Sequence, residues 1–166
     1  NIWRLLSSYT CSIKNILVKD SKSKDNISFK NGSQNKVNKP LGYMIENKIL
    51  LQQLIKAVIK ESRIEKFDTK VLSFYRKKES VQVKLASKKI LQCKLIIGAD
   101  GKNSLIRNLD DIGFTKKDYN QKAFIFNIKH EKKHNNLAVE NFLEQGPLAA
   151  LPIIKNKNKY FSSIVW

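Results

Sequence analysis

The residues best suited to chemistry follow a short apolar run beyond the middle of the chain. Residues 95–97 are Leu-Ile-Ile, and residues 98–101 are Gly-Ala-Asp-Gly. The apolar run predicts a strand buried on both faces, and ligands of α/β proteins bind at the carboxyl ends of such strands. Asp100 at that edge can accept hydrogen bonds from sugar-like hydroxyl groups. Glycine lets the backbone approach a ligand closely or adopt a positive φ, so Gly101 suits the same position.

A short helix is predicted over residues 102–109, with Asn103 or Ser104 available to cap its start. The first amide groups of a helix carry a partial positive charge that favours phosphate. Arg107 lies three residues after Ser104 and can meet a pyrophosphate. An Asp-Gly pair after a strand is also an ordinary turn, and Arg107 alone suits a solvated helix face. Only the full spacing favours a ligand site.

That spacing, Gly-Ala-Asp-Gly-x-x-Ser-x-x-Arg behind an apolar run, resembles the DG motif of the class A flavoprotein monooxygenases, the p-hydroxybenzoate-hydroxylase-like family. The resemblance implies that Asp100 contacts FAD and that Arg107 serves both the flavin and NAD(P)H. Gly101 and Ser104 match the motif and are carried over with them as cofactor-binding residues. In this family the oxygen chemistry belongs to the cofactor, so no side chain is assigned a catalytic role.

Two further blocks resemble the ubiquinone-biosynthesis branch of that family. Residues 41–47, Leu-Gly-Tyr-Met-Ile-Glu-Asn, look like its block at the start of a helix near the isoalloxazine, which implies a flavin contact at Asn47. Residues 146–152, Gly-Pro-Leu-Ala-Ala-Leu-Pro, look like its substrate-domain strands, which implies that Pro147 lines the substrate side. The implied function is hydroxylation of a polyprenylated phenol with FAD, NAD(P)H and O2 on the route to ubiquinone.

The sequence departs from the family pattern in lacking two of the family's FAD-binding segments. No Gly-x-Gly-x-x-Gly occurs, and the Gly-Asp-Ala block that completes the flavin site is absent. The chain starts at Asn1 without an initiator methionine and stops at Trp166 directly after a strand-like run. We therefore expect an internal fragment of a longer protein, one that alone binds FAD weakly or not at all and is inactive. A nonfunctional remnant of a split gene stays open as an alternative.

The formal net charge is +18, from 32 basic and 14 acidic residues. The lysines are dispersed through every segment beside many Asn and Ile residues, which favours compositional drift over a polyanion site. A basic nucleic-acid-binding protein would gather its lysines on one face, so no nucleic-acid partner is expected. The resemblance implies a cytoplasmic protein, with the inner face of the inner membrane and other ubiquinone-biosynthesis enzymes as candidate partners. A flavin hydroxylase or halogenase of another, soluble aromatic compound stays open.

Other chemically suggestive residues have simpler interpretations. Cys11 and Cys93 lack metal-ligand or disulfide-framework spacing, so no such site is expected. His130 and His134 are four residues apart in a strand-like stretch without a third ligand, which favours surface or turn histidines over a metal site.

The predicted fold class is mixed α/β, with part of a discontinuous Rossmann-like FAD-binding domain and an antiparallel-sheet substrate domain. Apolar periodicity predicts a helix over 47–64, and alternation predicts a hairpin from 13–18 and 27–29. A three-stranded meander is expected over 70–98. Strands are expected at 123–130, 138–143, 148–154 and 160–166, with Gly146-Pro147 as a turn. Residues 1–40 and 110–166 are assigned mainly to the substrate domain, and 41–109 to the FAD domain.

Overall fold

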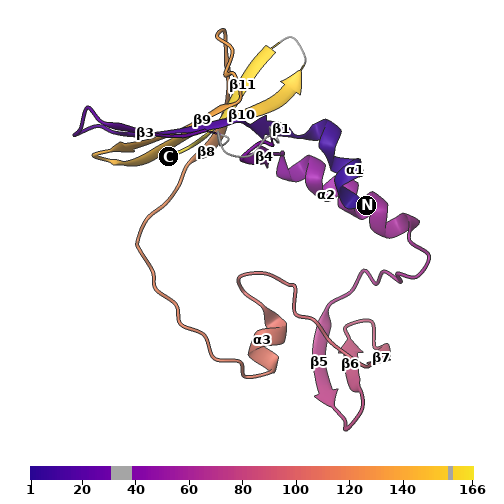
Figure 1. Ribbon diagram of the computed structural model, residues 1–166. Helices are drawn as coiled ribbons and strands as arrows, with labels where there is room; N and C mark the ends of the chain where they lie inside the picture. Colours follow the sequence, from indigo (N-terminus) through magenta and orange to yellow (C-terminus); the bar gives the residue numbers. More distant parts are fainter. Residues whose placement is uncertain (31–38, 157–158) are drawn as a thin grey trace. The chain divides into compact units, whose positions relative to one another are not determined.

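The computed structural model describes residues 1–30, 39–156 and 159–166. The chain forms two compact units, residues 1–64 with 121–166 and residues 65–120, which we call unit 1 and unit 2 (Figure 1). Each unit has its own sheet, and each carries part of the predicted site.

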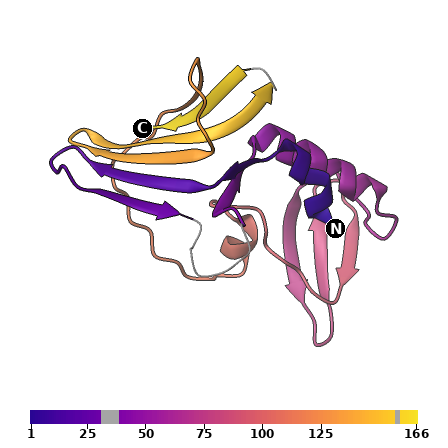
Figure 2. The ribbon, with the colours of Figure 1, turned by 45° about the horizontal axis from the view of Figure 1, so that its top comes forward.

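Unit 1 is built on a six-stranded sheet with strand order β3-β2-β9-β10-β11-β8. All neighbouring strands are antiparallel except β2 and β9, which run parallel (Figure 2). A separate two-stranded ladder joins β1 to β4. The elements are α1 (Ile2–Leu6), the 3-10 helix η1 (Ser7–Tyr9), β1 (Cys11–Ile13), β2 (Asn15–Asp20), β3 (Asn26–Lys30), β4 (Gly42–Met44), α2 (Asn47–Lys60), β8 (Ile125–His130), β9 (Leu137–Leu143), β10 (Gly146–Asn156) and β11 (Lys159–Val165).

The predicted hairpin and the four predicted C-terminal strands are confirmed, with small shifts at their ends. The turn between β9 and β10 is not at Gly146-Pro147, as the sequence predicted, but two residues earlier, at residues 144–145. Gly146 and Pro147 pair with Leu143 and Phe142 instead. Gly146 has φ +120°, a conformation that glycine adopts without strain and that suits the start of a strand after a tight turn.

Helix α2 is confirmed over Asn47–Lys60, four residues shorter than predicted. Its apolar residues divide into two stripes. Leu50, Leu54 and Val58 are half-buried, whereas Leu51 and Ile59 belong to an exposed stripe. The residues at i, i+4 and i+8 therefore form the half-buried face of the helix, as expected for an amphipathic helix.

The core of unit 1 draws on both faces of its sheet. Ala149 and Ile153 are buried from one face of β10, and Pro152 from the other. Ile164 of β11 lies opposite Ala150 and is also buried. Strands β10 and β11 thus hold most of the buried residues of this sheet among those described.

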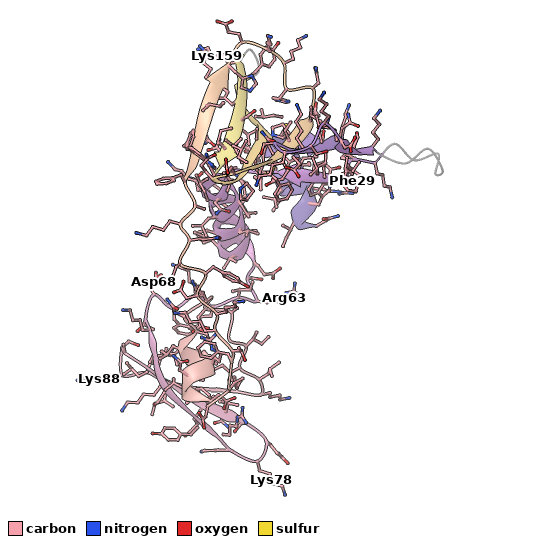
Figure 3. All side chains as sticks on the ribbon, turned by 90° about the vertical axis from the view of Figure 1, so that its left-hand side faces the viewer. Phe29, Arg63, Asp68, Lys78, Lys88 and Lys159 are labelled. Carbon is pink, nitrogen blue, oxygen red and sulfur yellow. The ribbon has the colours of Figure 1, made fainter. Side chains whose placement is uncertain are left out.

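Unit 2 contains an antiparallel meander and a short helix. The elements are β5 (Val71–Arg76), β6 (Val81–Leu85), β7 (Ile90–Cys93) and α3 (Leu105–Leu109). The core of the meander is on its central strand, where Val83 and Leu85 are buried. Lys78 and Lys88 mark the β5–β6 and β6–β7 turns (Figure 3).

One predicted strand is wrong in part. Strand β7 ends at Cys93, and residues 95–98 are not in a strand. Leu95 and Ile97 are 71% and 75% exposed, so this segment is not buried on both faces. An apolar strand of that kind needs neighbouring strands to satisfy its backbone, and no described strand pairs with this segment.

The mixed α/β fold class is confirmed, with sheet predominating. The assignment of residues 41–109 to an FAD domain stays a prediction. Within the described residues, no helix combines the length and the hydrophobicity needed to cross a membrane.

The two neighbouring isoleucines of β10 provide a test of the core. Ile153 is 4% exposed and Ile154 is 47% exposed. Replacing Ile153 by Ala should lower the free energy of unfolding by about 2–4 kcal/mol, because the buried methyl groups leave a cavity. Ile154→Ala should cost less than about 1 kcal/mol. Urea unfolding of the purified chain, followed by circular dichroism, measures both; equal losses would contradict the placement of the core.

Candidate functional site

The Asp100 carboxylate organises the start of helix α3. Its Oδ1 accepts a hydrogen bond from the Ser104 hydroxyl, and its Oδ2 accepts from the backbone amides of Leu105 at 2.6 Å and Ile106 at 3.2 Å. Ser104, the N-cap residue, is 6% exposed, and its Oγ accepts from the Arg107 amide at 3.0 Å. Asp100 and Ser104 together satisfy three amides that a helix start leaves without intrahelical partners.

These hydrogen bonds shift the acidity of Asp100. The Ser104 hydroxyl lowers the pKa of the Asp100 carboxyl below its ordinary value of 3.8; partial desolvation opposes the shift and the backbone amides add to it. A carboxyl with a lowered folded-state pKa stabilises the fold above its unfolded pKa, and this contribution is lost as the pH falls through the folded value. The cap on α3 is therefore fully formed at neutral pH.

Two glycines of the motif meet different constraints. A Cβ at Gly98 would lie 3.0 Å from Cβ of Ile106, so this segment packs closely against α3 and Ile106 would have to shift to admit a side chain. Gly101 has φ +84° and open space around the Cβ position. Its backbone is therefore accessible, in a conformation that other residues adopt only with strain.

Arg107 is held by contacts that the sequence did not predict. Its Nη2 donates to the Lys102 carbonyl oxygen at 3.0 Å, and its guanidinium carbon lies 4.1 Å from the centre of the Phe114 ring. Its Nε is buried without an acceptor among the described residues. The cation–π contact with Phe114 gave no signal in the sequence, because residues 110–124 show no periodicity that would place a side chain.

Asp100, Gly101, Ser104 and Arg107 all lie in unit 2. Asp100 also borders a largely apolar cavity of about 490 Å³, together with Val71, Ile96, Ile97, Leu105 and Ile106. A carboxylate has about four lone-pair sites, and three are used here, so Asp100 retains capacity for a ligand hydroxyl. The carboxylate, the open Gly101 backbone and the Arg107 cation fit part of an FAD.

Asn47 and Pro147 lie in unit 1. Asn47 is the first residue of α2, is exposed, and lines a cavity of about 370 Å³ with Leu151, Ser163 and Val165 of the sheet. Pro147 is exposed and lines a cavity of about 330 Å³ that also borders Val165. Val165 of β11 therefore lines both cavities.

The histidines form a small polar cluster on unit 1. His130 Nε2 lies 3.0 Å from the Ser162 hydroxyl, and His134 Nδ1 accepts from the Asn136 amide at 3.0 Å. Burial and then the nearby His130 lower the pKa of His134. Within the described residues, no three of the potential metal ligands gather into a site.

Comparison with curated proteins identifies relatives of one kind. No family model matches the chain. It is 31% identical over 172 residues to ubiquinone hydroxylase UbiL of Rhodospirillum rubrum, covering 99% of this chain and 37% of that protein. It is 36% identical to the mitochondrial ubiquinone biosynthesis monooxygenase COQ6 of Danio rerio, covering 76% of this chain and 28% of the relative. It is 29% identical to 3-demethoxyubiquinol 3-hydroxylase of Escherichia coli, with 76% and 32% covered.

Solved structures agree on the fold. The chain matches Pseudomonas aeruginosa PqsL, described as a probable FAD-dependent monooxygenase, with a TM-score of 0.73 at 16% identity, covering 99% of this chain and 48% of that one. It matches Klebsiella pneumoniae HpxO complexed with FAD with a TM-score of 0.66 at 14% identity, covering 98% and 42%.

The fold is thus that of the FAD-dependent monooxygenases. Within that class, the chain is homologous to a part of the ubiquinone-biosynthesis hydroxylases, and it spans about a third of the length of the curated relatives it matches. The resemblance predicted from the DG motif and its flanking blocks is confirmed.

The Asp100 cap predicts a shift that can be titrated. Ser104→Ala removes the largest cause of the lowered pKa, so the Asp100 pKa should rise toward 3.8. The loss of the N-cap should also cost about 0.5–2 kcal/mol of helix stability. Carbon-13 NMR titration of the aspartate carboxyls measures the pKa, with Ser80→Ala in the same unit as a control. An Asp100 pKa that is equal in the wild type and the Ser104 variant would contradict the cap.

The close packing at Gly98 predicts that alanine substitutions at Gly98 and at Gly113 differ in their effect on the stability of α3. Gly98→Ala should weaken α3 by about 1–3 kcal/mol, because its Cβ would crowd Ile106. Gly113→Ala meets open space in the same unit and should cost less than about 0.5 kcal/mol. Hydrogen exchange at the Asp110 amide, which donates to the Ile106 carbonyl at 3.0 Å, measures the opening of the helix. Equal exchange rates in the two variants would refute the close packing.

Proposed function

We propose that this chain is part of an FAD- and NAD(P)H-dependent monooxygenase that hydroxylates a polyprenylated phenol in ubiquinone biosynthesis. Homology along almost the whole chain to UbiL, a ubiquinone hydroxylase, carries the proposal. The cluster built on Asp100 supports it, because its carboxylate, open backbone and cation suit a ligand that carries hydroxyl and phosphate groups.

We assign the cofactor side to unit 2 and to the start of α2. Asp100 would accept a hydroxyl group of FAD, and the Gly101 backbone would lie against the cofactor. Ser104 would keep Asp100 in place, and Arg107 would face phosphate of the flavin or of NAD(P)H. Asn47 would contact the flavin ring from the start of α2. The exposure of Asn47 and its position at a cavity agree with this role.

We assign the substrate side to the sheet of unit 1. Pro147 is exposed at a cavity that Val165 and Trp166 also line, and it would contact the aromatic substrate. When bound, FAD would supply the oxygen-transfer chemistry, with NAD(P)H as the reductant, one atom of O2 entering the ring and the other leaving as water. The protein's contribution would be to position the ring and to exclude water.

The proposal includes peripheral contact with the inner face of the inner membrane, because a polyprenyl tail on the substrate is apolar. Exposed lysines occur in both units, as Lys78, Lys88 and Lys159 illustrate (Figure 3). Cations near an anionic leaflet contribute about 1 kcal/mol each, so a dispersed basic surface would favour such contact without a dedicated patch.

The proposal is tested on the protein with its natural flanking sequence. NAD(P)H oxidation should be stimulated by a short-chain polyprenyl phenol, and the product should carry one oxygen atom from isotopically labelled O2. Arg107→Ala should lower the rate by about tenfold or more. Arg63→Ala, which removes a solvent-exposed arginine paired with Glu61, should leave it within about twofold. Folded protein that binds flavin but never incorporates labelled oxygen would refute the activity.

A further inference from the structure

A second cavity of unit 2, of about 460 Å³, is strongly basic. Four of its lining side chains are cations, namely Lys102 and Arg107 from the motif region and Lys116 and Lys117 from the following loop. No Asp or Glu is among its described lining residues. A concave surface with one sign of charge concentrates counter-ions, so the cavity favours an anion.

These four cations differ from the other basic residues of unit 2 that form ion pairs. Arg76 pairs with Asp110, and Lys89 pairs with Glu65 at 3.4 Å. Among the described residues, none of the four cations lies within ion-pair distance of a carboxylate. Like charges gathered in one concave place repel one another, and an anion from solution would relieve that repulsion.

Arg107 is held in place before any ligand arrives. Its guanidinium donates to the Lys102 carbonyl and lies against the ring of Phe114, which is 60% exposed. A guanidinium that is already oriented loses less freedom on binding, and its planar donors match phosphate oxygens. Phe114 thus supports the cation from the loop, and Lys116 and Lys117 lie two and three residues after it along the chain.

We propose that this cavity binds a phosphate-bearing anion through Lys102, Arg107, Lys116 and Lys117. The inference rests on the proposed function, which gives Arg107 a phosphate of the flavin or of NAD(P)H, and deepens it by adding Lys102, Lys116 and Lys117 to that phosphate site. The phosphate could belong to a soluble nucleotide or to a lipid headgroup. The two sources share the same chemistry and can be separated by experiment.

The test uses the purified chain and inorganic pyrophosphate, measured by isothermal titration at physiological ionic strength. We expect saturable binding at one site per chain. Lys116→Gln with Lys117→Gln should weaken it by about tenfold or more, since both variants remove a charge that faces the ligand. Lys77→Gln with Lys78→Gln is the matched control: it removes the same charge from the same unit, at the β5–β6 turn, and should change affinity by less than about twofold.

The outcomes distinguish the cavity from the general basicity of the chain. Equal weakening by the two pairs of substitutions, or no saturable binding of pyrophosphate, would overturn the proposal.

Phosphatidylglycerol vesicles then identify the source of the phosphate: if they bind the chain and pyrophosphate displaces them, the cavity accepts a lipid headgroup. If NADPH binds with the same dependence on Lys116 and Lys117 and the vesicles do not, the source is a soluble nucleotide. Vesicle binding that pyrophosphate cannot displace would count against the cavity. Because the titration contains no flavin, its result is independent of the hydroxylase activity.

Discussion

The carboxylate of Asp100 is the interaction on which the candidate cofactor site depends. It holds the Ser104 hydroxyl and two backbone amides, and Ser104 in turn holds the amide of Arg107. A five-residue helix such as α3 is too short to be stable through its own hydrogen bonds. The cap therefore fixes the helix, and the helix fixes where Arg107 projects. The same carboxylate that would meet a ligand hydroxyl also builds the surface around it.

Some of these features could be predicted from the sequence because they depend on local chemistry. The spacing from Asp100 to Arg107 encodes a strand end, an N-cap and a helical turn, and the structure contains the last two. The periodicity of residues 47–60 and the alternation in β9 to β11 reflect the half-buried surfaces that those elements form. The turn before β10 was misplaced by two residues because Gly146 and Pro147 are typical turn residues in general, whereas here the glycine opens the strand.

Other features depend on partners that are remote in the sequence. Residues 95–98 have the composition of a buried strand, yet burial requires neighbouring strands, and composition cannot supply them. Phe114 contacts Arg107 from the irregular chain that follows α3, and Lys116 and Lys117 line one cavity with Lys102 only because that loop folds back. Dispersion of lysine along the sequence thus concealed a local concentration of charge. Asn47 and Pro147, a hundred residues apart, border Val165 in neighbouring cavities through the pairing of β10 with β11.

The central claim is that Asp100 both caps α3 and contacts the cofactor, and its most direct test is the FAD dissociation constant of the protein with its natural flanking sequence. Asp100→Asn keeps the shape of the side chain but removes its charge. The account predicts flavin binding weakened by about tenfold or more, whereas Asp118→Asn, an exposed aspartate of the same unit, leaves it unchanged. Equal flavin affinity in the wild type and the Asp100 variant, with α3 folded in both, would contradict the claim.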